Sequence, residues 1–296
     1  MKTKQNIALV AILAFGISAA AVKAEDTASS ASATEKSTYT LFQPTPSSEM
    51  REMNTDRIGQ TSSAQTVNAG HFQLEADVAN YGFKKSKANN GASVETRSIR
   101  VAPLQIRAGL TETLEMQVAL DTYVNREISV AGASGTTSGM GDLRTGFKGT
   151  LASSENGRDF AIAVMPSIKW PTNRGGLGNN SIEGGIAFPM QAQVASTWNL
   201  GAQLGVDYNR NLSSTSRHAE LTTALSVGRG INDEIDAFAG ISSLKSYEKG
   251  GQWMASLNAG AGYSFSKDFR MDAGANFGMT EAADDVNPYI GAAVRF

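Results

Sequence analysis

The sequence predicts an all-β fold, namely an antiparallel up-and-down transmembrane β-barrel of about 12 strands that follows a mostly irregular N-terminal segment. Three observations favour this fold. Segments of about ten residues alternate apolar and polar side chains with the period of two that a strand imposes. The links between these segments alternate between long and short. The chain also ends on such a segment at Phe296, so pairing of the last strand with the first would leave no exposed edge.

The first 24 residues have the composition of a secretory signal peptide. Lys2 and Lys4 precede an apolar run, and Val22 and Ala24 are small residues at the positions that a signal peptidase reads. The run is too short for a comfortable membrane-spanning helix, and no later segment supplies about 18 continuous apolar residues. We therefore expect residues 1–24 to be a signal peptide and any membrane anchoring to use strands.

Composition excludes several classes of protein. The chain has no cysteine, which rules out disulfides, thiolate metal sites and a lipid-modified cysteine. Three of its 26 basic residues lie in the signal peptide, which leaves 23 against 28 acidic ones, so there is no basic surface for nucleic acid. Export without disulfides suits the envelope of a Gram-negative bacterium. The 30 glycines favour strands and tight turns over helices.

Residues 25–70 precede the alternating part of the chain. They are rich in Ser, Thr, Ala and Glu, contain Pro44 and Pro46, and show no sustained period up to about Thr66. Such a composition predicts a linker that is largely disordered at first. We expect this linker, or plug segment, to lead into a barrel over residues 71–296.

The first three predicted strands cover residues 72–82, 94–110 and 114–124. Residues 111–113 would join the second and third strands in a hairpin. Polar residues such as Gln73, Gln105 and Gln117 occupy the alternate positions. The apolar positions are Phe72, Leu74, Ala76 and Val78; Leu104, Ile106, Ala108 and Leu110; and Leu114, Met116, Val118 and Leu120. Pro103 interrupts the second strand where the alternation slips, and a β-bulge there would account for both features.

Nine further strands follow the same pattern, although 235–244 is the least regular. They are expected at residues 143–151, 160–169, 182–190, 199–208, 220–227, 235–244, 253–263, 269–277 and 288–296. Long polar links would join odd to even strands at residues 84–92, 125–140, 171–180, 210–217, 246–251 and 280–287. Most even-to-odd links are shorter, which predicts periplasmic turns on one rim and outer loops on the other. Aromatic residues near the strand ends would form two interfacial girdles.

Charged residues at the inward-facing positions carry both signs. The candidate lumen-facing residues are Glu75, Asp77, Arg107, Glu115, Asp121, Arg144, Lys148, Lys169, Glu183, Asp207, Glu220, Arg270, Asp272 and Arg295. One interpretation is a wet, salt-bridged interior without specificity. The other is a solute path whose mixed charge accepts neutral or amphiphilic molecules better than a lumen of one sign would. A barrel of about 12 strands should have a narrow or plugged pore.

The residues that could support catalysis form no convincing site, and we predict no enzyme, no cofactor and no metal site. His218 near Ser214 or Ser216 is the one candidate for a lipid hydrolase of the outer membrane. The tetrad 242–245 fits the pattern S-x-x-K but ends a strand instead of opening a helix. Asp284 and its neighbours could bind a divalent cation, although a solvated loop accounts for them better.

Several sequence motifs resemble the outer-membrane transporter family of the MetA pathway of phenol degradation. They lie at residues 54–61, 66–75, 165–173, 176–179 and 283–289, within a resemblance that covers 54–296. Ile58 stands where family members usually carry proline after Thr-Asp-Arg. The resemblance implies a barrel that moves hydrophobic or aromatic compounds, and it implies no catalytic residues. The ending with Val294 and Phe296 also resembles the C-terminal signal of outer-membrane barrels. The match is partial, because Ile290 stands where that signal usually has a polar residue.

Two residues just ahead of the first strand suggest a plug. Asp56 and Arg57 could enter the lumen and pair with the inward charges, and the alternative is a loose periplasmic leader. We therefore expect a porin-like passive channel for small, hydrophobic or aromatic solutes. Its partners would be outer-membrane lipid, lipopolysaccharide and, through Phe296, the barrel-assembly machinery. The alternative functions are a structural or surface-adhesion barrel and, less favoured, the lipid hydrolase; a soluble periplasmic β-sandwich is the alternative fold.

Overall fold

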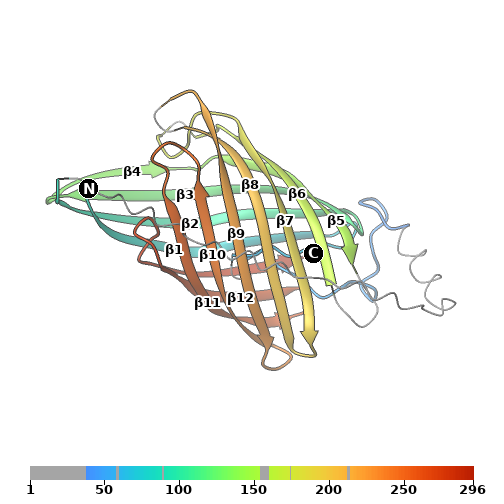
Figure 1. Ribbon diagram of the computed structural model, residues 1–296. Helices are drawn as coiled ribbons and strands as arrows, with labels where there is room; N and C mark the ends of the chain where they lie inside the picture. Colours follow the sequence, from blue (N-terminus) through green and yellow to red (C-terminus); the bar gives the residue numbers. More distant parts are fainter. Residues whose placement is uncertain (1–37, 58–59, 89, 154–159, 174, 212–213) are drawn as a thin grey trace, which may run out of the picture.

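The chain folds into a closed antiparallel β-barrel in a computed structural model that describes residues 38–57, 60–88, 90–153, 160–173, 175–211 and 214–296 (Figure 1). The predicted signal peptide lies outside the described residues. No helix long and apolar enough to cross a membrane occurs in the part of the chain that the structure describes. The strands are β1 (Phe72–Lys87), β2 (Ser93–Thr111), β3 (Leu114–Val130), β4 (Ala133–Gly139), β5 (Leu143–Ser153), β6 (Phe160–Trp170), β7 (Glu183–Ala195), β8 (Trp198–Arg210), β9 (Arg217–Gly230), β10 (Ile235–Ser246), β11 (Trp253–Ser266), β12 (Phe269–Gly278) and β13 (Val286–Arg295).

The first and last strands close the barrel, as the sequence predicts. β1 pairs with β13 from Gln73 opposite Arg295 to Phe83 opposite Val286. The backbones of Phe72 and Phe296 exchange two hydrogen bonds of 2.9 Å, and their rings stack with centroids 6.2 Å apart. Twelve strands form the ring, because β4 pairs only with β3. Closure gives every strand of the ring two hydrogen-bonded neighbours, which a lipid environment requires.

The segment between residues 125 and 140 differs from the expected loop. β3 continues to Val130, turns at Ala131 and Gly132, and returns as β4. Both turn residues have positive φ, 50° and 90°, as a two-residue hairpin turn requires. Ile128 and Val130 continue the alternation, but the many Ser, Thr and Gly residues of β4 hide it. Together with the paired ends of β1 and β2, the resulting hairpin extends past the remaining strands at one end of the barrel (Figure 1).

The irregularity expected at Pro103 is displaced. β2 keeps one register with β3 from Val101 to Pro103. The strained residue is Ala102, whose φ of 48° lies in the left-handed region. The register shift lies on the neighbouring strand β1, between Asp77 and Ala79, where β1 pairs with β13. Thr122 on β3 donates its hydroxyl to the carbonyls of Val101 and Ala102, both at 2.7 Å. A bulge at Pro103 itself was therefore a wrong prediction, because β2 keeps its register with both β1 and β3 there and the extra residue of β1 lies in its pairing with β13.

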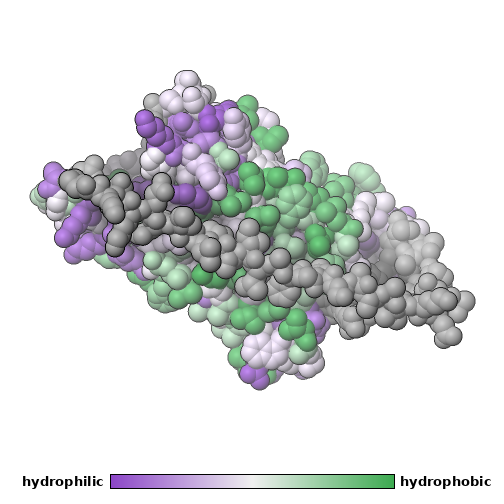
Figure 2. Space-filling view, viewed as in Figure 1, coloured by the Kyte–Doolittle hydropathy of each residue, from purple (hydrophilic) through white to green (hydrophobic). Residues whose placement is uncertain are grey.

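The barrel has a polar interior and an apolar exterior. Arg107, Lys148 and Glu115 are fully buried, whereas outward-facing Phe147 and Leu225 are 48% and 57% exposed. Figure 2 shows hydrophobic side chains gathered in a band between hydrophilic ends. Lipid chains would cover this band, so the large exposed apolar area needs no other partner. Residues 38–57 and 60–70 lie at the end of the barrel where the chain terminates (Figure 1).

Candidate functional site

Residues 38–57 and 60–70, here called the inserted segment, enter the barrel through a clamp at the β2–β3 turn. Glu112 in this turn accepts hydrogen bonds from the Ala69 amide and the Asn68 side chain, both at 3.1 Å, and from the Thr45 hydroxyl. Arg51 forms an ion pair of 3.0 Å with the same carboxylate. One side chain of the wall thus holds both ends of the inserted segment.

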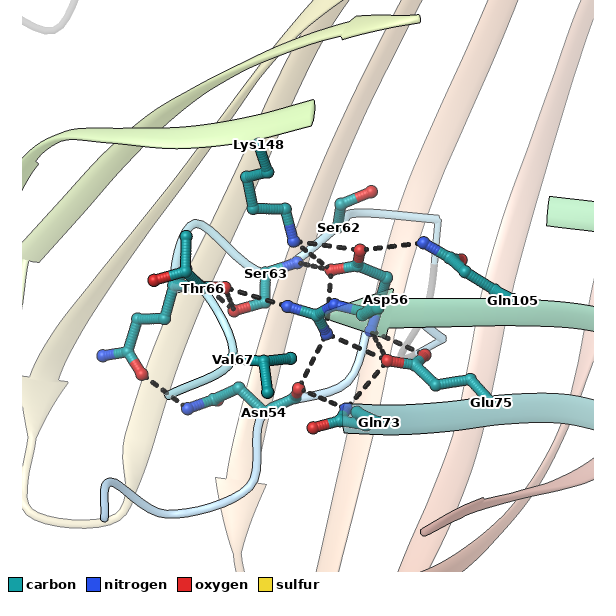
Figure 3. Close-up of polar contacts among 12 residues, drawn as sticks. Asn54, Asp56, Ser62, Ser63, Thr66, Val67, Gln73, Glu75, Gln105 and Lys148 are labelled. Carbon is teal, nitrogen blue, oxygen red and sulfur yellow. Dashed lines mark hydrogen bonds and ion pairs between the residues drawn. The ribbon is translucent and has the colours of Figure 1, made fainter. Parts of the chain in front are cut away.

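Asp56 reaches the charged wall of β2, β3 and β5. Its carboxylate accepts hydrogen bonds from Lys148 Nζ at 2.7 and 2.9 Å, from Gln117 at 3.0 Å and from Gln105 at 3.3 Å. Its own backbone amide donates to Glu75 at 2.9 Å. Figure 3 shows Lys148, Gln105 and Glu75 converging on Asp56 from the surrounding strands. Because the site is almost closed to water, each of these bonds is stronger than it would be on the surface.

Arg107 is the centre of the same network and is fully buried. Its guanidinium binds both oxygens of Glu115, at 2.9 and 3.0 Å, and Glu75 at 2.9 Å. The two remaining N–H groups donate to backbone carbonyls of the inserted segment, Asn54 at 2.9 Å and Gln65 at 3.0 Å. All five donors of Arg107 are therefore used, and two of them require the inserted segment to be in place.

Arg57 turns away from Lys148 to the stretch of wall formed by β1, β13 and β12. It donates two hydrogen bonds of 3.0 Å to Asp272 and forms an ion pair of 2.5 Å with Asp77. Burial alone would lower the pKa of Arg57, but the hydrogen bonds and charge of Asp272 outweigh it and raise the pKa above its usual value. Gly291 on β13 leaves the space for the guanidinium, because a Cβ there would overlap it.

The inserted segment also reaches the far wall of the barrel. The Ser62 amide donates to Gln203 on β8 at 2.8 Å, and the Ala64 amide donates to Gln191 on β7 at 3.1 Å. The hydroxyl of Thr61 lies 2.9 Å from that of Ser226 on β9. Contacts to strands on opposite sides of the ring mean that the segment crosses the lumen.

A cavity of about 430 Å³ lies inside the barrel against the inserted segment. Asp56, Gln60 and Ser62 of the segment form part of its surface. Its walls mix apolar side chains, such as Met165 and Leu244, with hydroxyl and amide groups. Such a composition suits a small molecule that is mostly apolar and carries few polar atoms.

The remaining predicted lumen residues form separate pairs. Arg144 contacts Asp207 at 3.3 Å, Glu220 contacts His218 at 3.1 Å, and Lys169 is paired with Glu183. Arg270 pairs with Asp236 at 2.7 Å and Arg295 with Asp268 at 2.8 Å. Asp121 has no ion pair among the residues that the structure describes. The predicted charges therefore divide into one network around Asp56 and Arg57 and several pairs along the wall.

The glutamines of the wall were not among the predicted site residues. Gln105, Gln117, Gln191 and Gln203 all bind the inserted segment. Their inward positions follow from the same alternation that identified the charges. An inward amide carries no charge and therefore stands out less in the sequence, although a buried amide needs a hydrogen-bond partner as much as a buried charge does.

The candidate catalytic groups have other contacts. His218 is bonded to Asn211 at 2.8 Å and to Glu220, and His71 to the carbonyl of Thr45 at 2.9 Å. Within the described ranges, no cluster of three or more His, Asp or Glu side chains could hold a metal ion.

Comparisons with known proteins agree with this architecture. The family model "Putative MetA-pathway of phenol degradation" matches residues 55–296. No curated protein matches the chain in sequence. The COG4313 outer membrane channel from Pseudomonas putida F1 is similar with a TM-score of 0.58 at 12% identity, over 85% of this chain and 99% of that one. The translocator domain of the autotransporter NalP from Neisseria meningitidis gives a TM-score of 0.51 at 12% identity, over 77% and 90% of the two chains.

Proposed function

The chain belongs to the outer-membrane transporter family whose model matches residues 55–296, and from this membership we propose that it is a passive channel for small, hydrophobic or aromatic solutes. It is a β-barrel of the Gram-negative outer membrane, with an apolar belt toward lipid and a polar lumen. Its fold is that of a protein described as an outer membrane channel. The observation that carries the proposal is the mixed apolar and polar cavity inside the barrel.

The inserted segment acts, in this proposal, as a plug. Asp56 and Arg57 are consecutive residues that bind opposite walls, through Lys148 on one side and Asp272 on the other. Two anchors in opposite directions resist displacement better than one. The segment would therefore restrict the passage of ions and water while it leaves the cavity beside it for a solute.

The outer surface would interact with the envelope through separate features. The apolar belt contacts lipid, and the basic residues of the outer loops would contact lipopolysaccharide phosphates. Phe296 is 67% exposed beside Phe72, where the barrel-assembly machinery would read it. The long β3–β4 hairpin favours surface adhesion as the second candidate function, because it extends beyond the barrel.

Single-channel conductance of the refolded chain in a planar bilayer tests the proposal. The wild type should conduct in small steps, and small phenols should interrupt them. The double variant Asp56→Ala, Arg57→Ala should conduct more, because both anchors of the inserted segment are lost. The matched double variant Glu95→Ala, Arg97→Ala removes an exposed ion pair and should conduct like the wild type. Equal conductance of all three would show that the segment is no plug, and a folded barrel that never conducts would favour the structural function.

A further inference from the structure

Arg144 and Asp207 project into the same cavity from strands that are not neighbours. Arg144 is on β5 and Asp207 on β8, and both line the cavity. The side chain of Arg144 passes over β6 and β7, donates to Ser167 at 2.7 Å and ends 3.3 Å from Asp207. Small residues make this span feasible: a Cβ at Gly185 would lie 2.5 Å from Asp207 Oδ1.

Both members of this pair keep unused hydrogen-bonding groups. Arg144 makes its contacts through Nη1, so Nε and Nη2 have no acceptor among the described residues. Asp207 accepts through Oδ1, and Oδ2 has no described donor. The side chains are 40% and 26% exposed, which leaves these atoms open to the cavity. The pair therefore offers a donor and an acceptor side by side with no net charge.

A mostly apolar row lies next to the pair on the same wall. Met165 is opposite Ala187, and the row continues through Gly205 and Thr222 to Leu244 on β10, each facing its neighbour on the next strand. Met165, Ala187 and Leu244 line the cavity, and Thr222 is the one polar member of the row. The row is two residues along the strands from Gly185, which adjoins Asp207, so both lie on the same face. A flat apolar ring against this row would bring a substituent to the Arg144–Asp207 pair.

We infer that Arg144 and Asp207 form a head-group site for the hydroxyl of a small neutral phenol or alcohol, whose apolar body rests on the Met165–Leu244 row. This inference rests on the proposed channel function and names its solute class. A hydroxyl accepts from the guanidinium and donates to the carboxylate, so it satisfies both unused groups at once. A carboxylate would be repelled by the negative charge of Asp207, and a protonated amine by the positive charge of Arg144. A plain hydrocarbon would leave both groups without a hydrogen-bond partner.

Binding of phenol, toluene and benzoate to the refolded chain in detergent micelles tests the inference, with affinities from saturation-transfer NMR. Arg144→Met and Asp207→Ala should each weaken phenol binding by about tenfold, because each removes one hydrogen bond to the hydroxyl. Toluene binding should stay as in the wild type. The wild type should bind benzoate more weakly than phenol. Arg270→Met is the matched control, since it breaks another Arg–Asp pair that does not line the cavity.

Three results would overturn the inference. Phenol affinity that is unchanged in both variants would make the pair a structural ion pair only. Equal losses for phenol and toluene would show a general change of the cavity. Tighter binding of benzoate than of phenol would make the site an anion site. If toluene still binds the wild type in any of these cases, the inference fails but the proposed channel function stands. If none of the probes binds, the result contradicts the proposed function as well.

Discussion

Arg107 on β2 and Glu115 on β3 pair diagonally across the β2–β3 hairpin with both carboxylate oxygens bound, at 2.9 and 3.0 Å, and neither side chain is exposed to solvent. A surface pair of this kind contributes little, but a buried charge that loses its partner is costly. The pair also holds the inserted segment, since the Val67 amide donates to Glu115 at 2.6 Å. Stability of the wall and position of the segment therefore depend on the same two side chains.

Arg107→Met should destabilise the barrel strongly. It leaves Glu75 and Glu115 without their main cation, and removal of one partner from a buried pair costs about 3–5 kcal/mol. The loss in the free energy of unfolding is measured by urea titration of the refolded chain in detergent, with the heat-dependent gel shift of the folded barrel as the readout. Arg97→Met, in an exposed pair with Glu95, should cost less than about 1 kcal/mol. Equal losses in the two variants would show that burial of Arg107 is unimportant.

Gly291→Ala should release Arg57 without changing any charge. The added Cβ would overlap the Arg57 guanidinium and lie 2.5 Å from the Ala76 carbonyl, so Arg57 must shift and its contacts with Asp272 and Asp77 should weaken. We expect single-channel conductance to rise toward that of the Asp56→Ala, Arg57→Ala variant. Gly228→Ala is the control, because its Cβ would meet only the Ala237 carbonyl at 3.9 Å. Unchanged conductance in Gly291→Ala would argue against restriction of the pore by Arg57.

Removal of the β3–β4 hairpin should leave the barrel intact. β4 pairs only with β3, and β3 has already paired with β5 between Leu114 and Leu120. Residues 126–130 of β3 also pair with residues 94–98 at the tip of β2, while the rest of β2 pairs with β3 below them. A chain in which two glycines replace residues 126–138 should therefore keep its heat modifiability and its conductance. If the shortened chain fails to fold, the ring needs the pairing between the hairpin and the tip of β2. Loss of adhesion to a surface partner would instead support the second candidate function.

Asp284 gives a pH dependence that can be measured. It lies in the outer link between β12 and β13 and keeps contact with water, but partial burial of its carboxyl raises the pKa above the usual 3.8, although Arg100 and Lys84 oppose the shift. A raised pKa means that the folded state favours the protonated acid. Its contribution to stability is complete below pH 3.8 and is lost as the pH rises through the folded-state pKa.

The variant Asp284→Asn should therefore be more stable than the wild type at neutral pH. The difference should disappear below pH 3.8, where both side chains are neutral. Partial exposure makes the effect small. Urea unfolding at a series of pH values measures it, with Asp285→Asn as the neighbouring control. A difference that grows as the pH falls would contradict the direction of the shift.

Alternation in the sequence was sufficient to predict the ring of twelve strands. The reason is local: a strand places successive side chains on opposite faces, whatever its neighbours are. The same rule puts Arg107 and Lys148 in the lumen. It did not reveal β4, because a Ser, Thr and Gly strand has no apolar face to show. It also predicted a bulge at Pro103 on β2, whereas the structure has the bulge on β1. The alternation within one strand cannot locate a bulge, because a bulge depends on how two strands pair.

The sequence by itself thus determined the class of fold, the closing strand at Phe296 and the polar interior, since each depends on neighbouring residues. Only the tertiary structure decided the partners. Lys148 meets Asp56 and Arg57 meets Asp272 because closure of the ring and the register of β1, β12 and β5 bring together residues that are far apart in the chain. The Arg144–Asp207 pair likewise depends on tertiary structure, because β6 and β7 lie between the strands that carry the two residues. A local sequence pattern carries no information about that spacing.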